Sequence, residues 1–197
     1  MRSLILFTIS AALVFADGNF KPEKGFKSIF NGKDLTGWTK AKENEESFKV
    51  ENGMIVANGK VCHLFYTGKD GKANFKNFEL KVDVMTKANS NGGIYFHTEY
   101  QEKSWPNKGF DVQVNNTHRD VKKTGGLYNV QDNLEKVAED DKWFTEHIVV
   151  QGNHVTVFVD GKKVSDWTQP EGWAGPKGNP GRMLSSGTNP APVEASK

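Results

Sequence analysis

The sequence predicts an all-β protein, an antiparallel two-sheet sandwich of the jelly-roll type. Short runs of apolar residues alternate with polar ones, most clearly from Phe78 to Val84, where every second side chain is apolar. The 20 glycines and many asparagines suit the tight turns that join strands. The pattern contains neither a long helical period nor an alternation of strands with helices. Several short strands separated by turns therefore favour a sandwich.

Turn residues mark the ends of the predicted strands in order. Asn31-Gly32 ends the first strand, the Glu-Asn-Gly segment 51–53 joins the second and third as a hairpin, and Asp160-Gly161 turns the last pair. One face of each strand is apolar and is expected to enter the core. The expected strands are 26–30, 47–50, 54–57, 61–66, 78–84, 94–99, 110–115, 146–151 and 155–159, with a further one beginning at 163–164.

The first residues differ in character from the rest of the chain. Arg2 gives a positive start, an apolar stretch follows that is too short to cross a bilayer, and Val14-Phe15-Ala16 offers small residues for a signal peptidase. We predict that residues 1–16 are a cleaved signal peptide and that the protein is secreted or periplasmic. The alternative is a buried N-terminal strand or helix. No other stretch of the sequence is typical of a membrane span.

The remaining chain predicts one domain between two polar ends. Residues 17–24 are expected to form a flexible leader and residues 25–188 the sandwich domain. Residues 189–197 are rich in proline and lack a strand pattern, so we expect a disordered or aberrant tail.

Composition narrows the classes of function. The 26 Lys and Arg residues nearly balance the 24 Asp and Glu residues, which gives no reason to expect a nucleic acid or another polyanion as partner. The single cysteine, Cys62, has no partner for an internal disulfide. It stands in an apolar, strand-like run, so we expect a buried structural residue and not a nucleophile.

Polar residues on two neighbouring strands form the main candidate site. Period-two geometry puts Tyr95, His97 and Glu99 on one face of their strand. It puts Asp111, Gln113 and Asn115 on one face of the next strand. If the strands pair, a carboxylate, an imidazole and an amide meet on the solvent side. Sugars are bound by such planar polar groups under an aromatic ring, and Trp105 in the connecting loop is the expected ring. The competing interpretation is a solvated sandwich face without a site.

Further candidates follow the second strand. His118, Lys123 and Tyr128 are predicted to contribute to substrate binding. The other histidines, His63, His147 and His154, lie in strand-like runs and are expected to be structural. None of the histidine spacings is that of a zinc site. A calcium ion held by Asp111, Glu99 and backbone oxygens is an option without a loop signature.

Several ordered segments resemble a known family, the 3-keto-disaccharide hydrolase domain, formerly a domain of unknown function. Residues 25–38 resemble its opening, 91–96 its central strand and 109–114 its Gly-aromatic-acid-aliphatic-Gln strand, while 123–128 and 159–162 match later segments. The resemblance extends from Gly25 to Thr188. It implies a concanavalin A-like jelly roll of the lectin and glucanase type, which agrees with the strand pattern. After this stretch, family members continue into further strands where this chain has residues 189–197.

The resemblance implies a secreted glycoside hydrolase acting on carbohydrate already oxidised to a ketone at C3. Such a ketone acidifies the C2 proton, so that deprotonation, elimination of the C1 substituent and hydration can cleave the glycoside. His97 or Glu99 is the candidate base, and Gln113, Tyr128 or Lys123 the candidate enolate stabiliser. Asp111 would position hydroxyls or a metal. Direct hydrolysis by Glu99 and Asp111, a carbohydrate-binding module without catalysis and a structural cell-surface module remain alternatives.

Overall fold

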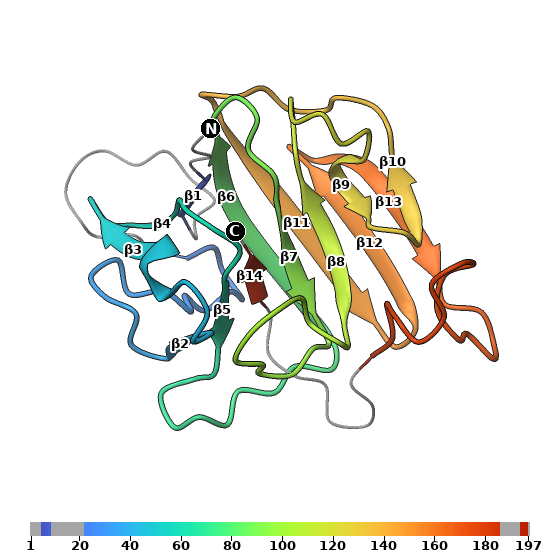
Figure 1. Cartoon of the computed structure of the whole chain (residues 1–197), viewed down its shortest axis with the longest axis horizontal. Helices are drawn as coiled ribbons and strands as arrows, with labels where there is room; N and C mark the ends of the chain where they lie inside the picture. The colour runs from blue at the N-terminus through green and yellow to red at the C-terminus, as the bar shows by residue number, and fades with distance from the viewer. Residues whose placement is uncertain (1–4, 9–21, 186–193, 197) are drawn as a thin grey trace.

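The computed structural model describes residues 5–8, 22–185 and 194–196, which form two seven-stranded antiparallel sheets (Figure 1). Sheet A has the strand order β13-β12-β11-β6-β1-β4-β3, and sheet B the order β10-β9-β8-β7-β14-β5-β2. In the described part of the chain, the 3-10 turn η1 (Glu45–Ser47) is the only helical segment. The predicted all-β sandwich is confirmed.

The strands are short and follow the turn signals of the sequence. Sheet A contains β1 (Ile5–Thr8), β3 (Phe48–Glu51), β4 (Met54–Ala57), β6 (Phe78–Thr86), β11 (Trp143–Gln151), β12 (His154–Val159) and β13 (Lys162–Thr168). Sheet B contains β2 (Trp38–Lys40), β5 (His63–Tyr66), β7 (Gly92–Phe96), β8 (Phe110–Val114), β9 (Lys123–Leu127), β10 (Gln131–Asn133) and β14 (Glu194–Ser196).

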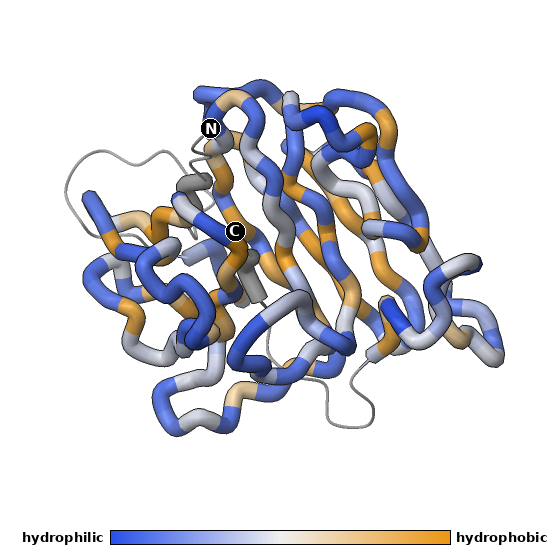
Figure 2. Tube along the Cα trace, viewed as in Figure 1, coloured by the Kyte–Doolittle hydropathy of each residue, from blue (hydrophilic) through white to orange (hydrophobic). Residues whose placement is uncertain are grey.

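The core lies between the two sheets and follows the period-two pattern. Leu80, Val82 and Val84 of β6 are buried, while the residues between them are partly exposed. Sheet B supplies Val112 and Val114 from β8, both fully buried. Figure 2 shows the resulting alternation of hydrophobic and hydrophilic residues along the strands. This alternation determines which face of each strand lies in the core. It therefore also determines which side chains lie on the outer face of the sheet, where a site can form.

Two expected strands differ from the structure. Residues 26–30 are irregular, because the segment leaves the sheets: the Ile29 carbonyl accepts a hydrogen bond from Trp38 Nε1 at 2.9 Å, and the Phe26 ring packs edge-on against His147 on the outer face of sheet A. The strand expected at 94–99 ends at Phe96, because the next residue, His97, has a φ of 52°. A left-handed residue cannot continue a strand.

Both ends of the chain contribute a strand. β1 lies inside the predicted signal peptide and pairs with β4 and β6, and β14 lies inside the predicted tail and pairs with β5 and β7. The structure thus differs from the expectation of a tail without strands at residues 194–196. The rest of that tail, most of the predicted signal peptide and residues 17–21 lie outside the described residues. Signal cleavage, export and the domain boundaries stay predictions. Within the described ranges, the chain has no helix with the length and apolarity of a membrane span.

Candidate functional site

The candidate site lies on the outer face of sheet B and is centred on Asp111. The register of β7 and β8 places Tyr95 opposite Asp111 and Gly93 opposite Gln113. Directly paired residues share one face of a sheet, so the pairing on which the candidate site depends is present. Asp111 is 7% exposed and Gln113 is 3% exposed, although both point away from the core.

Gly93 makes room for the Asp111 carboxylate. A Cβ atom at Gly93 would lie 1.9 Å from Asp111 Oδ1, well inside any tolerated contact. The carboxylate therefore rests directly on the backbone of β7, and only glycine leaves the space for it. The glycine at position 93 is thus explained by a side chain on the neighbouring strand.

Gln113 is oriented by hydrogen bonds on the far side of Asp111. Its amide nitrogen donates to Asn91 Oδ1 at 3.2 Å and to the Lys122 carbonyl at 3.4 Å. Asn115, the next residue on this face, is fully buried, and its amide donates to the carbonyls of Asp120 and Lys122. These bonds hold the loop between β8 and β9 against the end of the site.

Lys122 and Tyr128, which directly precede and follow β9, complete this side of the site. Tyr128 lies beside Asp111, because its backbone N–H donates a hydrogen bond to the backbone carbonyl of Asp111 at 2.9 Å. The Lys122 ammonium lies 4.1 Å from the centroid of the Tyr128 ring and 3.1 Å from the Asp132 carboxylate. Burial, together with the negative charges of Asp120, Asp111 and Asp132, raises the pKa of Tyr128. The phenol therefore stays protonated at neutral pH.

Aromatic rings border the opposite side. The His63 ring of β5 packs edge-on against Tyr95, with centroids 5.9 Å apart, and against Trp105, with centroids 5.4 Å apart. Trp105 belongs to the loop between β7 and β8, which folds back over the β5 side of the sheet. The same loop brings Tyr100 onto Phe65, with centroids 5.1 Å apart. Trp105 is half-buried at this place.

These groups form one arrangement, which we call the Asp111 cluster. It consists of His63, Tyr95, Trp105, Asp111, Gln113, Lys122 and Tyr128. It offers a carboxylate, an amide, a cation and a phenol between an aromatic wall and the β8–β9 loop. Polar groups of this variety in contact with aromatic rings are suited to a hydroxyl-rich ring.

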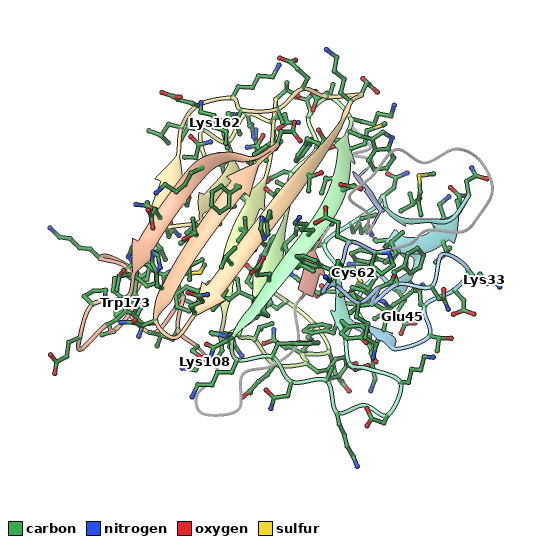
Figure 3. All side chains as sticks on the ribbon, turned by 180° about the vertical axis from the view of Figure 1, so that it is seen from behind. Lys33, Glu45, Cys62, Lys108, Lys162 and Trp173 are labelled. Carbon is green, nitrogen blue, oxygen red and sulfur yellow. The ribbon has the colours of Figure 1, made fainter. Side chains whose placement is uncertain are left out.

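His97 lies outside the Asp111 cluster. The expectation that it shares a strand face with Glu99 beside Asp111 is therefore wrong. The left-handed backbone of His97 turns the ring toward the end of the sandwich, where Nε2 lies 2.9 Å from the Lys76 carbonyl oxygen. There it lines a cavity of about 130 Å³ together with Phe110 and Trp167. Burial is the main cause that lowers the pKa of His97. Trp167 contacts Trp173, which lies at one end of the sandwich in Figure 3, with Lys162 at the other end.

Three other predicted site residues also lie outside the cluster. Glu99 is exposed on the loop that follows His97, because the strand ended before it. His118 Nδ1 accepts the Asp120 N–H at 3.1 Å, and Lys123 Nζ donates to the His118 carbonyl at 2.8 Å and to the Asp120 carbonyl at 2.7 Å. His118 and Lys123 thus stabilise the β8–β9 loop.

The structure does not provide the geometry that a calcium site at Asp111 and Glu99 would need. Such a site requires Asp111 and Glu99 to share a face, and the early end of β7 removes that condition. Among the described residues, no group of three or more His, Cys, Asp or Glu side chains is placed to hold a metal ion.

Sequence reasoning assigned no role in the site to three members of the cluster. Tyr95 was available from the same parity that pointed to His97, and Lys122 is adjacent to the lysine that was chosen instead. His63 had no local signal, because its neighbours Tyr95 and Trp105 are distant in the sequence.

Comparisons with solved structures show that other proteins share this sandwich fold. It is similar to a putative glycosyl hydrolase from Parabacteroides distasonis, with 21% identity over 88% of this chain and 91% of that chain, and a TM-score of 0.68. A second putative glycosyl hydrolase from the same organism has 20% identity over 81% of this chain and 89% of that chain, and a TM-score of 0.56. The carbohydrate binding module CBM66 from Bacillus subtilis has 14% identity over 83% of this chain and 88% of that chain, and a TM-score of 0.53. At these identities the likeness establishes the fold.

The family is given by the sequence itself. The model of the 3-keto-alpha-glucoside-1,2-lyase-like domain matches residues 25–188. The chain belongs to this family, which confirms the resemblance drawn from its motifs. Among curated proteins, none matches the chain. The solved structures agree with this family in fold.

Proposed function

We propose that the protein cleaves 3-keto-glycosides at the Asp111 cluster. One observation carries the proposal: Asp111, Gln113 and Tyr128, which all lie in segments matching the family, meet at one place between a cation and an aromatic wall. The family's name refers to lyase chemistry on a 3-keto-glucoside, and the cluster contains the groups that such chemistry requires.

The reaction needs a base, a stabilised oxygen and a proton donor. The base removes the C2 proton, and the C–H electrons form an enolate whose charge rests on the C3 oxygen. The enolate then expels the C1 substituent, which takes a proton as it leaves, and a C1=C2 double bond remains. Water adds its hydroxyl to C1 and a proton to C2, so the net reaction is hydrolysis. Donors held near the C3 oxygen lower the barrier by stabilising the developing charge.

We propose one role for each of four cluster residues. Asp111 takes the role of base, because His97 and Glu99 lie outside the cluster. The Gln113 amide and the Lys122 ammonium are donors for the C3 oxygen. Tyr128 is the proton donor for the leaving group, and its raised pKa keeps it protonated at neutral pH. Trp105 and Tyr95 would cover one face of the sugar.

A panel of disaccharides and their 3-keto forms tests the proposal. We expect turnover of the oxidised sugars alone, with a primary isotope effect when C2 carries deuterium. Turnover of unoxidised sugars, or a 3-keto sugar cleaved without an isotope effect at C2, would favour direct hydrolysis instead.

A carbohydrate-binding module is the second candidate. Its support is the aromatic wall of His63, Tyr95 and Trp105 together with the likeness to CBM66. Saturable binding of a 3-keto sugar without any turnover would select this function.

We also propose that the protein is exported and cleaved after Ala16. The support is the apolar stretch at residues 4–15, followed by small residues at the cleavage site. Sequencing the N-terminus of exported material should give Asp17 as the first residue. An intact Met1 would refute cleavage.

A further inference from the structure

A single strand bridges the two halves of sheet A. β1 pairs antiparallel with β4 through Ile5↔Ala57, Leu6↔Val56 and Phe7↔Ile55, and with β6 through Ile5↔Thr86, Leu6↔Met85, Phe7↔Val84 and Thr8↔Asp83. Figure 1 shows β1 between β4 and β6. In sheet A, β1 is the one connection between the pair β3–β4 and the block from β6 to β13.

The position between β4 and β6 has apolar, buried walls. Ile55 and Ala57 of β4 are 2% and 1% exposed, and Val84 and Thr86 of β6 are both 0% exposed. Ile55 and Val84 pair with the same position of β1, as do Ala57 and Thr86. Paired residues share a face, so a strand in this place presents two alternate positions to the core. Without it, β4 and β6 would lie roughly 10 Å apart, with unpaired backbone groups on both edges.

The strand that lies between β4 and β6 comes from the predicted signal peptide. Residues 5–8 belong to the apolar stretch with signal-peptide character, and cleavage after Ala16 would take the strand out of the middle of the sheet. Unpaired strand edges beside an open core are among the least stable arrangements in a sheet protein. A second strand is therefore needed wherever the leader is removed.

We propose that the gap between β4 and β6 is a strand-acceptor site. The intact chain fills it with Ile5–Thr8. A chain cleaved after Ala16, which rests on the export proposal above, takes up an uncharged, extended segment of another polypeptide, antiparallel to β4 and β6. The backbone hydrogen bonds on both sides give affinity, and apolar residues opposite Ile55 and Val84, and opposite Ala57 and Thr86, give selectivity. This site is independent of the Asp111 cluster and of its reaction.

Hydrogen exchange in the full, uncleaved chain tests the cis arrangement. Phe7→Asp puts a charge opposite two core residues, Ile55 and Val84, so we expect it to displace the strand. Amide exchange in β4 and β6 should then be at least tenfold faster, while β8 and β12 keep their protection. Phe15→Asp, the same change outside β1, is the control and should leave exchange unaltered.

A synthetic peptide of residues 3–10 tests the acceptor in trans. Added to the Phe7→Asp variant, it should restore slow exchange in β4 and β6 and raise the melting temperature. The same peptide with Leu6→Pro should do neither, because proline removes a backbone donor of the central residue. If the variant unfolds as a whole, recovery of its melting transition by the peptide still decides the question.

Two results would overturn the proposal. One is unchanged exchange in β4 and β6 of the Phe7→Asp variant. The other is exported protein beginning at Asp17 whose melting temperature and exchange do not respond to the peptide. Neither outcome touches the cleavage of 3-keto-glycosides, which is measured separately.

Discussion

The outer faces of the two sheets carry similar residues and differ in their surroundings. On sheet A, His147 lies 3.0 Å from Glu79, and His154 lies 2.6 Å from Asp166. On sheet B, a histidine, His63, and a carboxylate, Asp111, also occur on one face. By residue type alone, either face qualifies as a candidate site.

The two faces differ in how deeply their carboxylates are buried. The side chains of Glu79 and Asp166 are 50% and 41% exposed, whereas Asp111 is 7% exposed as a residue. Lys163 and then His154 donate hydrogen bonds that lower the pKa of Asp166, so this carboxylate remains ionised and solvated. Exposed ion pairs of this kind contribute little to stability. On sheet B, the loop with Trp105 folds over the β5 side of the face. On sheet A, Phe26 packs against His147 but Glu79 and Asp166 stay exposed. The cover, and not the residue types, distinguishes the candidate site.

The largest effect is expected from Asp111→Asn. The substitution keeps the shape of the side chain and removes the base, so turnover of a 3-keto-glycoside should fall by about a hundredfold or more. Steady-state kinetics and a melting curve measure the change and confirm the fold. Glu79→Gln on sheet A is the matched control and should leave turnover within about twofold. Equal losses in both variants would contradict the distinction between the faces.

Gly93→Ala tests the support of the carboxylate without altering its charge. The new Cβ would lie 1.9 Å from Asp111 Oδ1, so the carboxylate must move. A displaced base should reduce kcat by about tenfold or more, because proton transfer depends on placement within a fraction of an ångström. Gly152→Ala, in the β11–β12 turn of sheet A with no atom within 4 Å of the added Cβ, is the control. It should cost some stability through its positive φ and leave kcat unaltered. A normal kcat in Gly93→Ala would mean that Asp111 is not the base.

The sequence was sufficient for the elements whose pattern is local. The period-two alternation predicted β7 and β8, and with them the shared face of Asp111 and Gln113. It was not sufficient where the backbone departs from its regular form. His97 has a positive φ although it is not a glycine, and no neighbouring residue in the sequence indicates this. Because β7 ends there, neither His97 nor Glu99 lies on the face that carries Asp111.

Contacts between distant segments were also beyond the sequence pattern. His63 reaches the cluster because β5 lies near β7 across β14, in an order set by the whole sheet. The choice between Lys122 and Lys123 depended on where β9 begins, and strand ends are the least predictable part of a pattern. The cover given by Trp105 was predictable as a loop of the right length, but its contact with His63 was not.

Glu146→Gln tests the core that separates the two faces. Glu146 of β11 is fully buried, and one of its oxygens accepts the Gly125 N–H of sheet B at 3.1 Å. Burial, and to a smaller extent the charge of Asp111, raises its pKa well above the usual value. The folded state therefore holds a proton that the unfolded state releases, and stability is lost as pH rises from the unfolded pKa toward the folded one.

The amide of Glu146→Gln keeps the acceptor and cannot ionise. We expect the variant to melt higher than the parent above about pH 6, with the difference vanishing near pH 4, where both states of the parent bind the proton. A gain of 1 kcal/mol corresponds to about 3 °C in a domain of this size. Melting curves between these pH values measure it. Parallel curves for parent and variant would show that the Glu146 pKa is not raised.

The smallest effect is expected from Glu99→Gln, which sharpens the comparison within sheet B itself. Glu99 and Asp111 are both carboxylates, and strand parity alone would place them on one face. The structure buries Asp111 and leaves Glu99 exposed on the loop after β7. If enclosure defines the site, turnover of a 3-keto-glycoside by Glu99→Gln should remain within about twofold of the parent, as for an ordinary surface change. A loss comparable to that of Asp111→Asn would mean that the loop carrying Trp105 closes further over the bound sugar and brings the second carboxylate to it. The two carboxylates would then act as a pair, direct hydrolysis would replace elimination, and the isotope effect at C2 should disappear with it.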